Sequence, residues 1–160
     1  MKKFKWVIIL INLAIILFSF NYSVATKETI LKEGKLILLE LAPDDSRSVL
    51  QGDFMLLKYT ISRIETDSIS KRGYCVVRVD SIGIAERVRV QAGLVPLNKG
   101  EFLIEYNIAG KGISIGAEAF FLEEGQSEKY LKARYGALKV DKAGNSILVG
   151  LYDEKRELIK

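Results

Sequence analysis

The stretch WVIILINLAIILFSFNYSVAT, residues 6–26, decides how the rest of the chain is organised, because it contains 21 consecutive residues without a charged side chain. Most of these residues are valine, isoleucine, leucine, alanine or phenylalanine. A helix of this length extends roughly 31 Å, close to the hydrocarbon thickness of a bilayer. The stretch therefore predicts a transmembrane helix at the amino terminus.

The residues at the two ends of this stretch indicate its orientation. Lys2, Lys3 and Lys5 precede it, and a short positively charged flank normally remains in the cytoplasm. Trp6 and Tyr22 lie near its ends, where amphipathic rings prefer the membrane interface. We expect a single-pass protein with a cytoplasmic amino terminus and an extracytoplasmic remainder.

A cleaved signal peptide is the alternative for the same segment. Residues 7–18 form an apolar core of signal-like length, and Ser23-Val24-Ala25 has small residues at the positions that a signal peptidase inspects. We expect a retained anchor rather than a cleaved signal. The predicted organisation is a membrane anchor at residues 1–26, a stalk at 27–34 and one extracytoplasmic β-domain at 35–160.

The composition excludes several classes of function. The chain has 24 Lys+Arg against 20 Asp+Glu, and without the three leading lysines the balance is 21 against 20, with no basic patch of the kind that binds nucleic acid. The absence of histidine excludes Ser-His-Asp and Cys-His nucleophile systems and HExxH zinc sites. A single cysteine excludes an internal disulfide and zinc sites built on several thiolates. We expect no cofactor, no metal site and no nucleic-acid partner.

Apolar runs and alternating patterns predict strands throughout the β-domain. Continuous apolar runs at residues 36–41 and 54–61 are typical of strands buried on both faces. Alternation at residues 74–80 and 86–91 predicts a hairpin across residues 81–83, with Cys75 facing the core.

The next strand is expected at residues 101–108. There Phe102 and its alternate neighbours face the core, while Glu101 and its alternate neighbours mostly face solvent.

The carboxyl-terminal part predicts three further features. Residues 113–122 form a strand interrupted at Gly116. Residues 127–135 form a two-turn helix with Ser127 as N-cap and Gly136 as stop signal. Two strands at residues 137–140 and 146–152 form a last hairpin. The expected fold class is mainly β: a single antiparallel β-sandwich or partly open barrel with one short helix, preceded by the transmembrane helix.

Two polar clusters are candidates for binding. Carboxylates and an arginine gather in residues 43–53, and acidic residues precede the predicted short helix, which an arginine closes. The structural alternative is that the aspartates accept backbone hydrogen bonds in turns, the glutamates contribute to a helix cap and the arginine anchors the helix. The candidate binding residues are Asp45, Arg47, Gly52, Asp53, Tyr59, Glu123, Glu124, Arg134 and Tyr135.

No convincing catalytic set emerges from the sequence. A Ser/Lys dyad could be drawn from Ser46 or Ser48 with Lys58, if burial lowered the pKa of the lysine. An acid/base pair of carboxylates could be drawn from the same two polar clusters, but sequence does not supply their separation. We therefore assign no catalytic residue and expect that the protein is not an enzyme.

The segment Gly52-Asp53-Phe54-Met55-Leu56-Leu57-Lys58-Tyr59 resembles the signature of the GDYXXLXY proteins, with Phe54 in place of the usual tyrosine. Residues 41–48, 120–125, 133–136 and 144–151 also resemble segments of this family, so the similarity covers most of residues 28–152. The resemblance implies a bacterial protein anchored in the cytoplasmic membrane, of unassigned function and often associated with polytopic membrane proteins. It supplies no catalytic residues.

These observations lead to one expected function and two alternatives. We expect a non-enzymatic accessory or interaction module that docks on an integral membrane partner. The first alternative is an envelope domain that binds an anion or saccharide through Asp45, Arg47, Asp53, Glu124 and Arg134. The second is an envelope hydrolase that uses a Ser/Lys or carboxylate pair.

Overall fold

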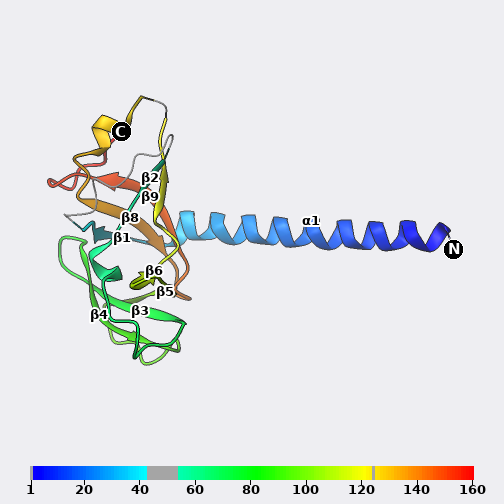
Figure 1. The fold of residues 1–160 in the computed structure, drawn as a ribbon, viewed down its shortest axis with the longest axis horizontal. Coiled ribbons are helices and arrows are strands. Elements are labelled where there is room, and N and C mark those ends of the chain that lie inside the picture. The colour runs from blue at the N-terminus through cyan, green and yellow to red at the C-terminus, as the bar shows by residue number, and fades with distance from the viewer. Residues whose placement is uncertain (1, 43–53, 124) are drawn as a thin grey trace.

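A 32-residue helix, α1 (Lys2–Glu33), leads into a mainly β-domain in the computed structural model, which describes residues 2–42, 54–123 and 125–160 (Figure 1). The helix is long and apolar enough to cross a membrane, and its side chains from Phe4 to Ala25 are exposed. The segment expected as a stalk, residues 27–34, continues the same helix as far as Glu33. Ile30 is buried against the β-domain, and its carbonyl accepts a hydrogen bond from the Gly34 amide at 2.8 Å, where the helix ends.

The first sheet joins the beginning and the end of the β-domain. It has the order β1 (Lys35–Glu40), β8 (Tyr135–Val140), β9 (Ser146–Tyr152), and all neighbours are antiparallel. The predicted turn between β8 and β9 is confirmed: Asp141 Oδ1 accepts hydrogen bonds from the Ala143 and Asn145 amides, each at 2.9 Å. The aspartate thus replaces the missing ladder bonds at the hairpin tip.

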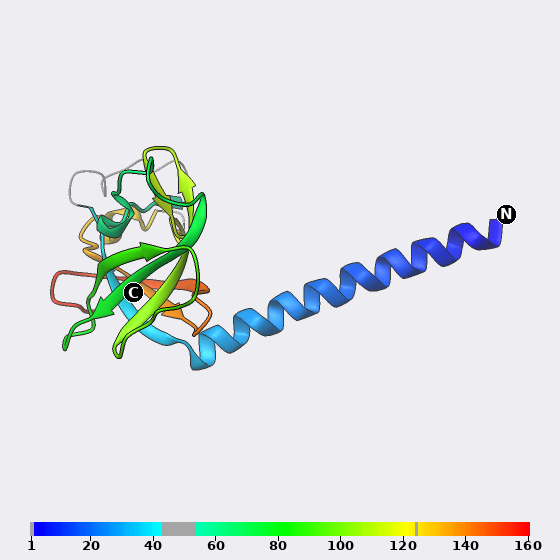
Figure 2. The ribbon, with the colours of Figure 1, turned by 90° about the horizontal axis from the view of Figure 1, so that it is seen from below.

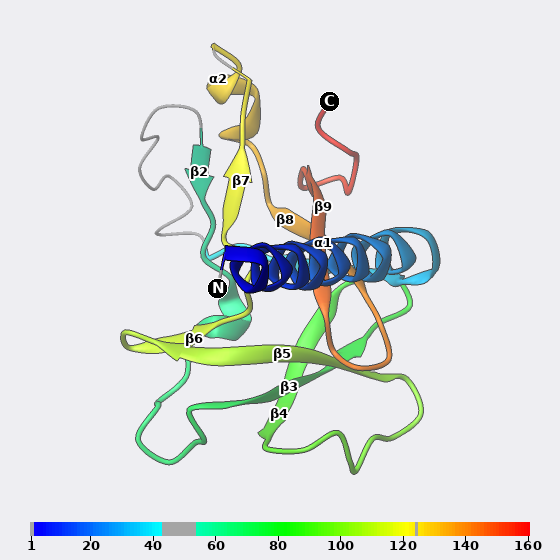
Figure 3. The ribbon, with the colours of Figure 1, turned by 90° about the vertical axis from the view of Figure 1, so that its right-hand side faces the viewer.

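The second sheet has four antiparallel strands in the order β4 (Ala85–Gln91), β3 (Arg72–Val79), β5 (Glu101–Ala109), β6 (Gly112–Ser114). The predicted hairpin between β3 and β4 is confirmed, and Asp80 Oδ1 accepts hydrogen bonds from the Ile82 and Ile84 amides. Figure 3, which views the domain from the side of α1, shows the two sheets on opposite sides of the helix. An isolated parallel bridge between Leu38 and Ile84 connects them.

A short two-stranded ribbon completes the strands. It pairs β2 (Phe54–Leu56) with β7 (Ala119–Phe121). The strand expected at residues 54–61 therefore ends early, and a single 3₁₀ turn, η1 (Thr60–Ser62), follows. The strand expected at residues 113–122 divides into β6 and β7 around Gly116, whose φ of +74° is strained for any residue with a side chain.

The predicted two-turn helix at residues 127–135 is wrong in length. Helix α2 spans only Ser127–Tyr130, and Gln126 rather than Ser127 occupies the N-cap position. Gly136, expected to stop the helix, lies inside β8. The Arg134 amide donates to the Tyr152 carbonyl at 2.8 Å and the Leu41 amide donates to the Arg134 carbonyl at 2.9 Å. Pairing with two distant strands thus overrides the local helical signals.

The core lies between the two sheets, and the fold is mainly β with antiparallel sheets that form a half-barrel, as predicted. Cys75 and Val77 are fully buried there, and burial raises the pKa of the Cys75 thiol to about 12. Seen from below, α1 leaves the domain at one edge rather than through its centre (Figure 2). The helix is therefore packed against the domain only over its last turns.

Candidate functional site

The signature segment meets a second family-like segment, residues 120–125, through the β2–β7 ribbon. Phe54 lies opposite Phe121 and Met55 lies opposite Phe120. Beyond the strand, the Leu57 amide donates to the Glu118 carbonyl at 2.6 Å. The signature residues from Phe54 onward therefore form part of one continuous structure with residues 118–121.

Tyr59, the last residue of the signature, lies in the core. Its side chain is fully buried, and its hydroxyl donates to the Ala117 carbonyl at 2.7 Å. Burial, and secondarily the charge of Glu118, raises the pKa of this hydroxyl, so the side chain stays protonated. The ring also lies against Gly136, where a Cβ atom would approach Tyr59 Cε1 to 2.8 Å. The structure thus gives this candidate binding residue a packing role.

Arg134 and Tyr135 lie where β8 meets its two neighbours. The Arg134 guanidinium donates to Glu40 Oε1 at 2.7 Å, and both side chains are about two-fifths exposed. Tyr135 is paired with Glu40 on one side and Tyr152 on the other. The arginine is therefore engaged with a partner from β1, a residue that was not among the candidates.

The remaining candidates divide into two groups. Glu123 is exposed, and its Oε2 accepts a hydrogen bond from Gln126 Nε2 at 2.6 Å. The other five candidates, like the serines of the considered dyad, lie outside the described residues: Asp45, Arg47, Gly52, Asp53 and Glu124. Among the described residues, no hydrogen bond or ion pair connects the Glu123–Gln126 pair with the Arg134–Glu40 pair.

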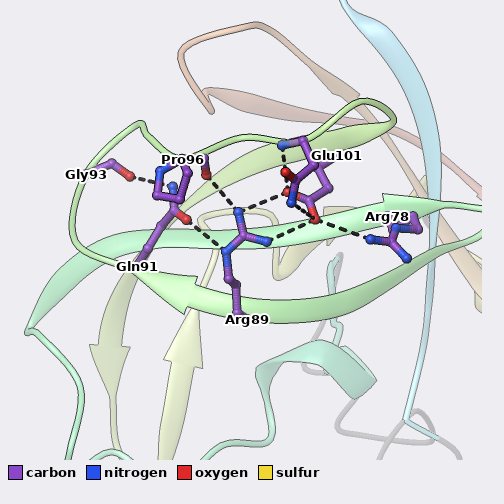
Figure 4. A network of polar contacts seen from close by, with 7 residues as sticks. Arg78, Arg89, Gln91, Gly93, Pro96 and Glu101 are labelled. Carbon is purple, nitrogen blue, oxygen red and sulfur yellow. Dashed lines mark hydrogen bonds and ion pairs between the residues drawn. The ribbon is translucent and has the colours of Figure 1, made fainter.

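A buried carboxylate that the sequence did not indicate lies at the start of β5 (Figure 4). Glu101 was expected on a mostly solvent-facing side, but its side chain has no exposed surface, so that prediction was wrong. Two nitrogens of Arg89 contact its carboxylate at 2.9 Å each, and the backbone amide of Asn98 donates to it at 3.0 Å. These bonds offset the cost of burying the charge.

The same contacts control the ionisation of Glu101. Hydrogen bonds from Arg89 and then Asn98 lower the pKa of the carboxyl from 4.5 to about 2. Arg89 also donates to the Pro96 carbonyl at 2.7 Å, so the network ties β4 and β5 to the loop at residues 92–100. No pattern in the sequence distinguishes Glu101 from an exposed strand glutamate, since the burial arises from the loop that folds back over it.

Two hollows flank the last turns of α1, with volumes of about 510 and 590 Å³. We call the first the junction crevice. Its helix side is lined by Ser19, Tyr22, Ser23, Thr26, Lys27 and Ile30, and its domain side includes Glu105, Asn107, Ile115, Gly116 and Asn145. The second hollow shares Thr26 and Ile30 and is lined by Phe102 and Val140 on the domain side.

The junction crevice was not predicted, although part of its helix side can be found in the sequence. Ser19, Ser23 and Thr26 are separated by four and three residues, so they share one helix face. The domain side comes from β5, two turns and the start of β9, which only the tertiary fold brings to the helix.

The lining of the crevice mixes polar and apolar side chains. Half of its lining residues carry hydroxyl or amide groups, one is a lysine, one is a glutamate, and the others are isoleucines and glycines. Among the described residues, no group of three or more histidine, cysteine, aspartate or glutamate side chains is placed to hold a metal ion.

Comparison with known proteins identifies one family. A family model described as "GDYXXLXY protein" matches residues 16–151, which confirms the resemblance predicted from the signature. No curated protein and no solved structure matches the chain.

Proposed function

The chain belongs to the GDYXXLXY family, and from that premise we propose that it is a non-enzymatic accessory protein of the bacterial cytoplasmic membrane. In this proposal α1 spans the membrane with its amino terminus in the cytoplasm. The β-domain stands on the extracytoplasmic side and docks, together with α1, on an integral membrane partner.

The retained anchor is supported by the way α1 joins the domain. The helix runs without a break through Ser23-Val24-Ala25, where a signal peptidase would cut, and continues to Glu33. Residues on both sides of Ala25 line the junction crevice, among them Tyr22 before it and Lys27 after it. Cleavage after Ala25 would remove Ser19, Tyr22 and Ser23 from the helix wall of this crevice.

The junction crevice is the observation that carries the docking proposal. Ser19, Ser23 and Thr26 present small hydroxyl side chains, which allow a second helix to approach closely and to form hydrogen bonds. The Thr26 hydroxyl donates to the Tyr22 carbonyl at 3.0 Å, so its oxygen serves as an acceptor. Asn107 and Asn145 offer amide groups on the opposite wall. A polypeptide that leaves the membrane beside α1 would find partners on both walls.

Site-specific photocrosslinking in intact membranes tests this proposal. A photoreactive phenylalanine analogue at Tyr22 or Asn145 should crosslink to one integral membrane protein, whose identity is then checked by a reciprocal crosslink from that protein. The matched control is Ile82, an exposed residue of the β3–β4 turn that lines neither hollow. If crevice positions and Ile82 give the same pattern, or no membrane protein is captured, the docking proposal is wrong.

The other two functions have less support from the described residues. The Ser/Lys dyad requires a buried lysine, and Lys58 is exposed. The anion-binding alternative needs an available Arg134, which is paired with Glu40. Neither observation favours a second proposal.

A further inference from the structure

The β2–β7 ribbon has one buried face and one exposed apolar face. Side chains alternate across a strand, so Met55 and its partner Phe120 share one face, while Phe54, Leu56 and Phe121 share the other. Met55 is 2% exposed, whereas Phe121 is 78% and Leu56 is 39% exposed. The rings of Phe54 and Phe121 lie with their centroids 6.3 Å apart. We call Phe54, Leu56 and Phe121 the ribbon patch.

The contacts of Phe120 establish which way the ribbon patch faces. Phe120 packs edge-on against Tyr130 of α2, with ring centroids 5.1 Å apart. Figure 1 shows the ribbon on the side of the domain from which α1 emerges, with α2 farther from that side, and Figure 3 shows α2 beyond the upper end of the ribbon. Since Phe120 points toward α2, the opposite face of the ribbon, with Phe54 and Phe121, points toward the side of α1.

The lining of the junction crevice shows which turns of α1 lie beside the chain that enters the ribbon. Ile115 and Gly116, which lead into β7, line that crevice together with Ser19, Tyr22 and Thr26 of the helix. The apolar run of α1 ends at Thr26. The chain that enters the ribbon therefore lies beside the turns of α1 that are expected at the membrane surface.

We propose that the ribbon patch rests in the interfacial layer of the membrane that α1 crosses. Burying aromatic and aliphatic side chains in the interfacial layer removes apolar surface from water, and the exposed Phe121 and Leu56 beside the half-buried Phe54 form a suitable contact for lipid. Lipid is favoured over a protein occupant because the patch is only three residues wide and faces along α1. This inference rests on the membrane span of the proposed function.

The ribbon patch then acts as a second contact beside the helix. A single helix leaves a domain able to rotate about the membrane normal and to tilt. An additional contact at a distance from α1 restricts the tilt, so the junction crevice would keep one orientation relative to the lipid surface.

Tryptophan fluorescence in vesicles tests the contact with the full-length protein. The vesicles contain phosphatidylethanolamine and phosphatidylglycerol, part of it brominated on the acyl chains near the headgroup. Trp6 is the only tryptophan of the sequence, so the wild-type protein reports insertion of α1. A Trp6→Phe background then carries either Phe121→Trp or the control Ile82→Trp, whose turn lies at the end of the domain far from α1 (Figures 1 and 2).

We expect the brominated lipid to quench tryptophan at position 121 at least about twofold more strongly than at position 82, with a blue-shifted emission. Equal quenching at the two positions, while Trp6 of the wild type is quenched, overturns the patch contact and leaves the anchor intact; a patch that serves a protein partner gives this result. If Trp6 of the wild type is not quenched, both the patch contact and the membrane anchor are wrong. If circular dichroism shows that Phe121→Trp does not fold, Phe54→Trp replaces it under the same criteria.

Discussion

The ring of Tyr59 lies directly against Gly136: a Cβ atom at Gly136 would lie 2.8 Å from Cε1 and 2.9 Å from the hydroxyl oxygen of Tyr59. Tyr59 is the last residue of the signature, and Gly136 closes the family-like segment at residues 133–136. The two residues are thus in contact although they are 77 positions apart in the sequence. The contact explains both residues by packing, without a ligand.

Gly136→Ala should destabilise the domain by roughly 1–3 kcal/mol, because the added methyl overpacks a fully buried ring. Urea denaturation followed by circular dichroism measures the change in the free energy of unfolding. Gly93→Ala is the matched control, since a Cβ at Gly93 meets no atom within 4 Å and its φ is not in the left-handed region. Equal effects of the two substitutions would contradict the role of the Tyr59 contact.

Tyr59→Phe should cost about 1 kcal/mol of unfolding free energy, since the Ala117 carbonyl loses the hydroxyl that donates to it. Thermal denaturation against a Tyr152→Phe control separates this loss from a general effect of removing a hydroxyl. Tyr152 is only half-buried, and its hydroxyl makes no hydrogen bond within the described residues. An unchanged stability of Tyr59→Phe would show that the bond contributes nothing.

The free energy of unfolding should decrease as the pH is lowered, because the Glu101 carboxylate becomes protonated. Its folded-state pKa is lowered from 4.5 to about 2. The stabilisation is therefore complete above pH 4.5 and is lost as the pH falls toward 2. Glu101→Gln should remove this part of the pH dependence, measured as the slope of the unfolding free energy between these two values. Glu105→Gln, at an exposed position of the same strand, is the matched control substitution. Parallel profiles for the wild type and Glu101→Gln would contradict the assignment.

The pair of Arg134 and Glu40 should contribute little to stability, despite the distance of 2.7 Å between guanidinium and carboxylate. Both side chains are substantially exposed, so solvent and salt screen the interaction. A double-mutant cycle with Arg134→Met and Glu40→Gln should give a coupling energy of about 1 kcal/mol or less that decreases as salt is added. A large, salt-independent coupling would indicate that the pair is more deeply buried in solution.

The sequence predicted the strands in which apolar and polar residues alternate in the same way as buried and exposed side chains. The hairpin across residues 81–83 and the inward position of Cys75 needed only period-two alternation and turn chemistry. The predicted length of the short helix was wrong because the helical signals in residues 127–135 compete with pairing to β1 and β9, which lie far away in the sequence. The prediction that Glu101 faces solvent was wrong for a similar reason, since its burial depends on a loop and on Arg89.

The candidate site also combines features that the local sequence predicts with features that only the tertiary fold produces. Residues of the signature could be recognised from the sequence, but whether Tyr59 binds a ligand or packs against Gly136 depends on a contact between distant segments. The junction crevice could not be predicted, because one wall belongs to α1 and the other to β5, two turns and the start of β9. Only the hydroxyl residues on its helix wall share a pattern that is visible in the sequence.

The unbroken course of α1 to Glu33 has a mechanical consequence. Residues 27–33 rise as helix by roughly 10 Å, and Gly34 passes directly into β1. The β-domain is therefore attached to a stiff rod and has no flexible tether. A change in the angle of α1 within a membrane would swing the β-domain through the same angle, so a partner bound to one end could alter the position of the other.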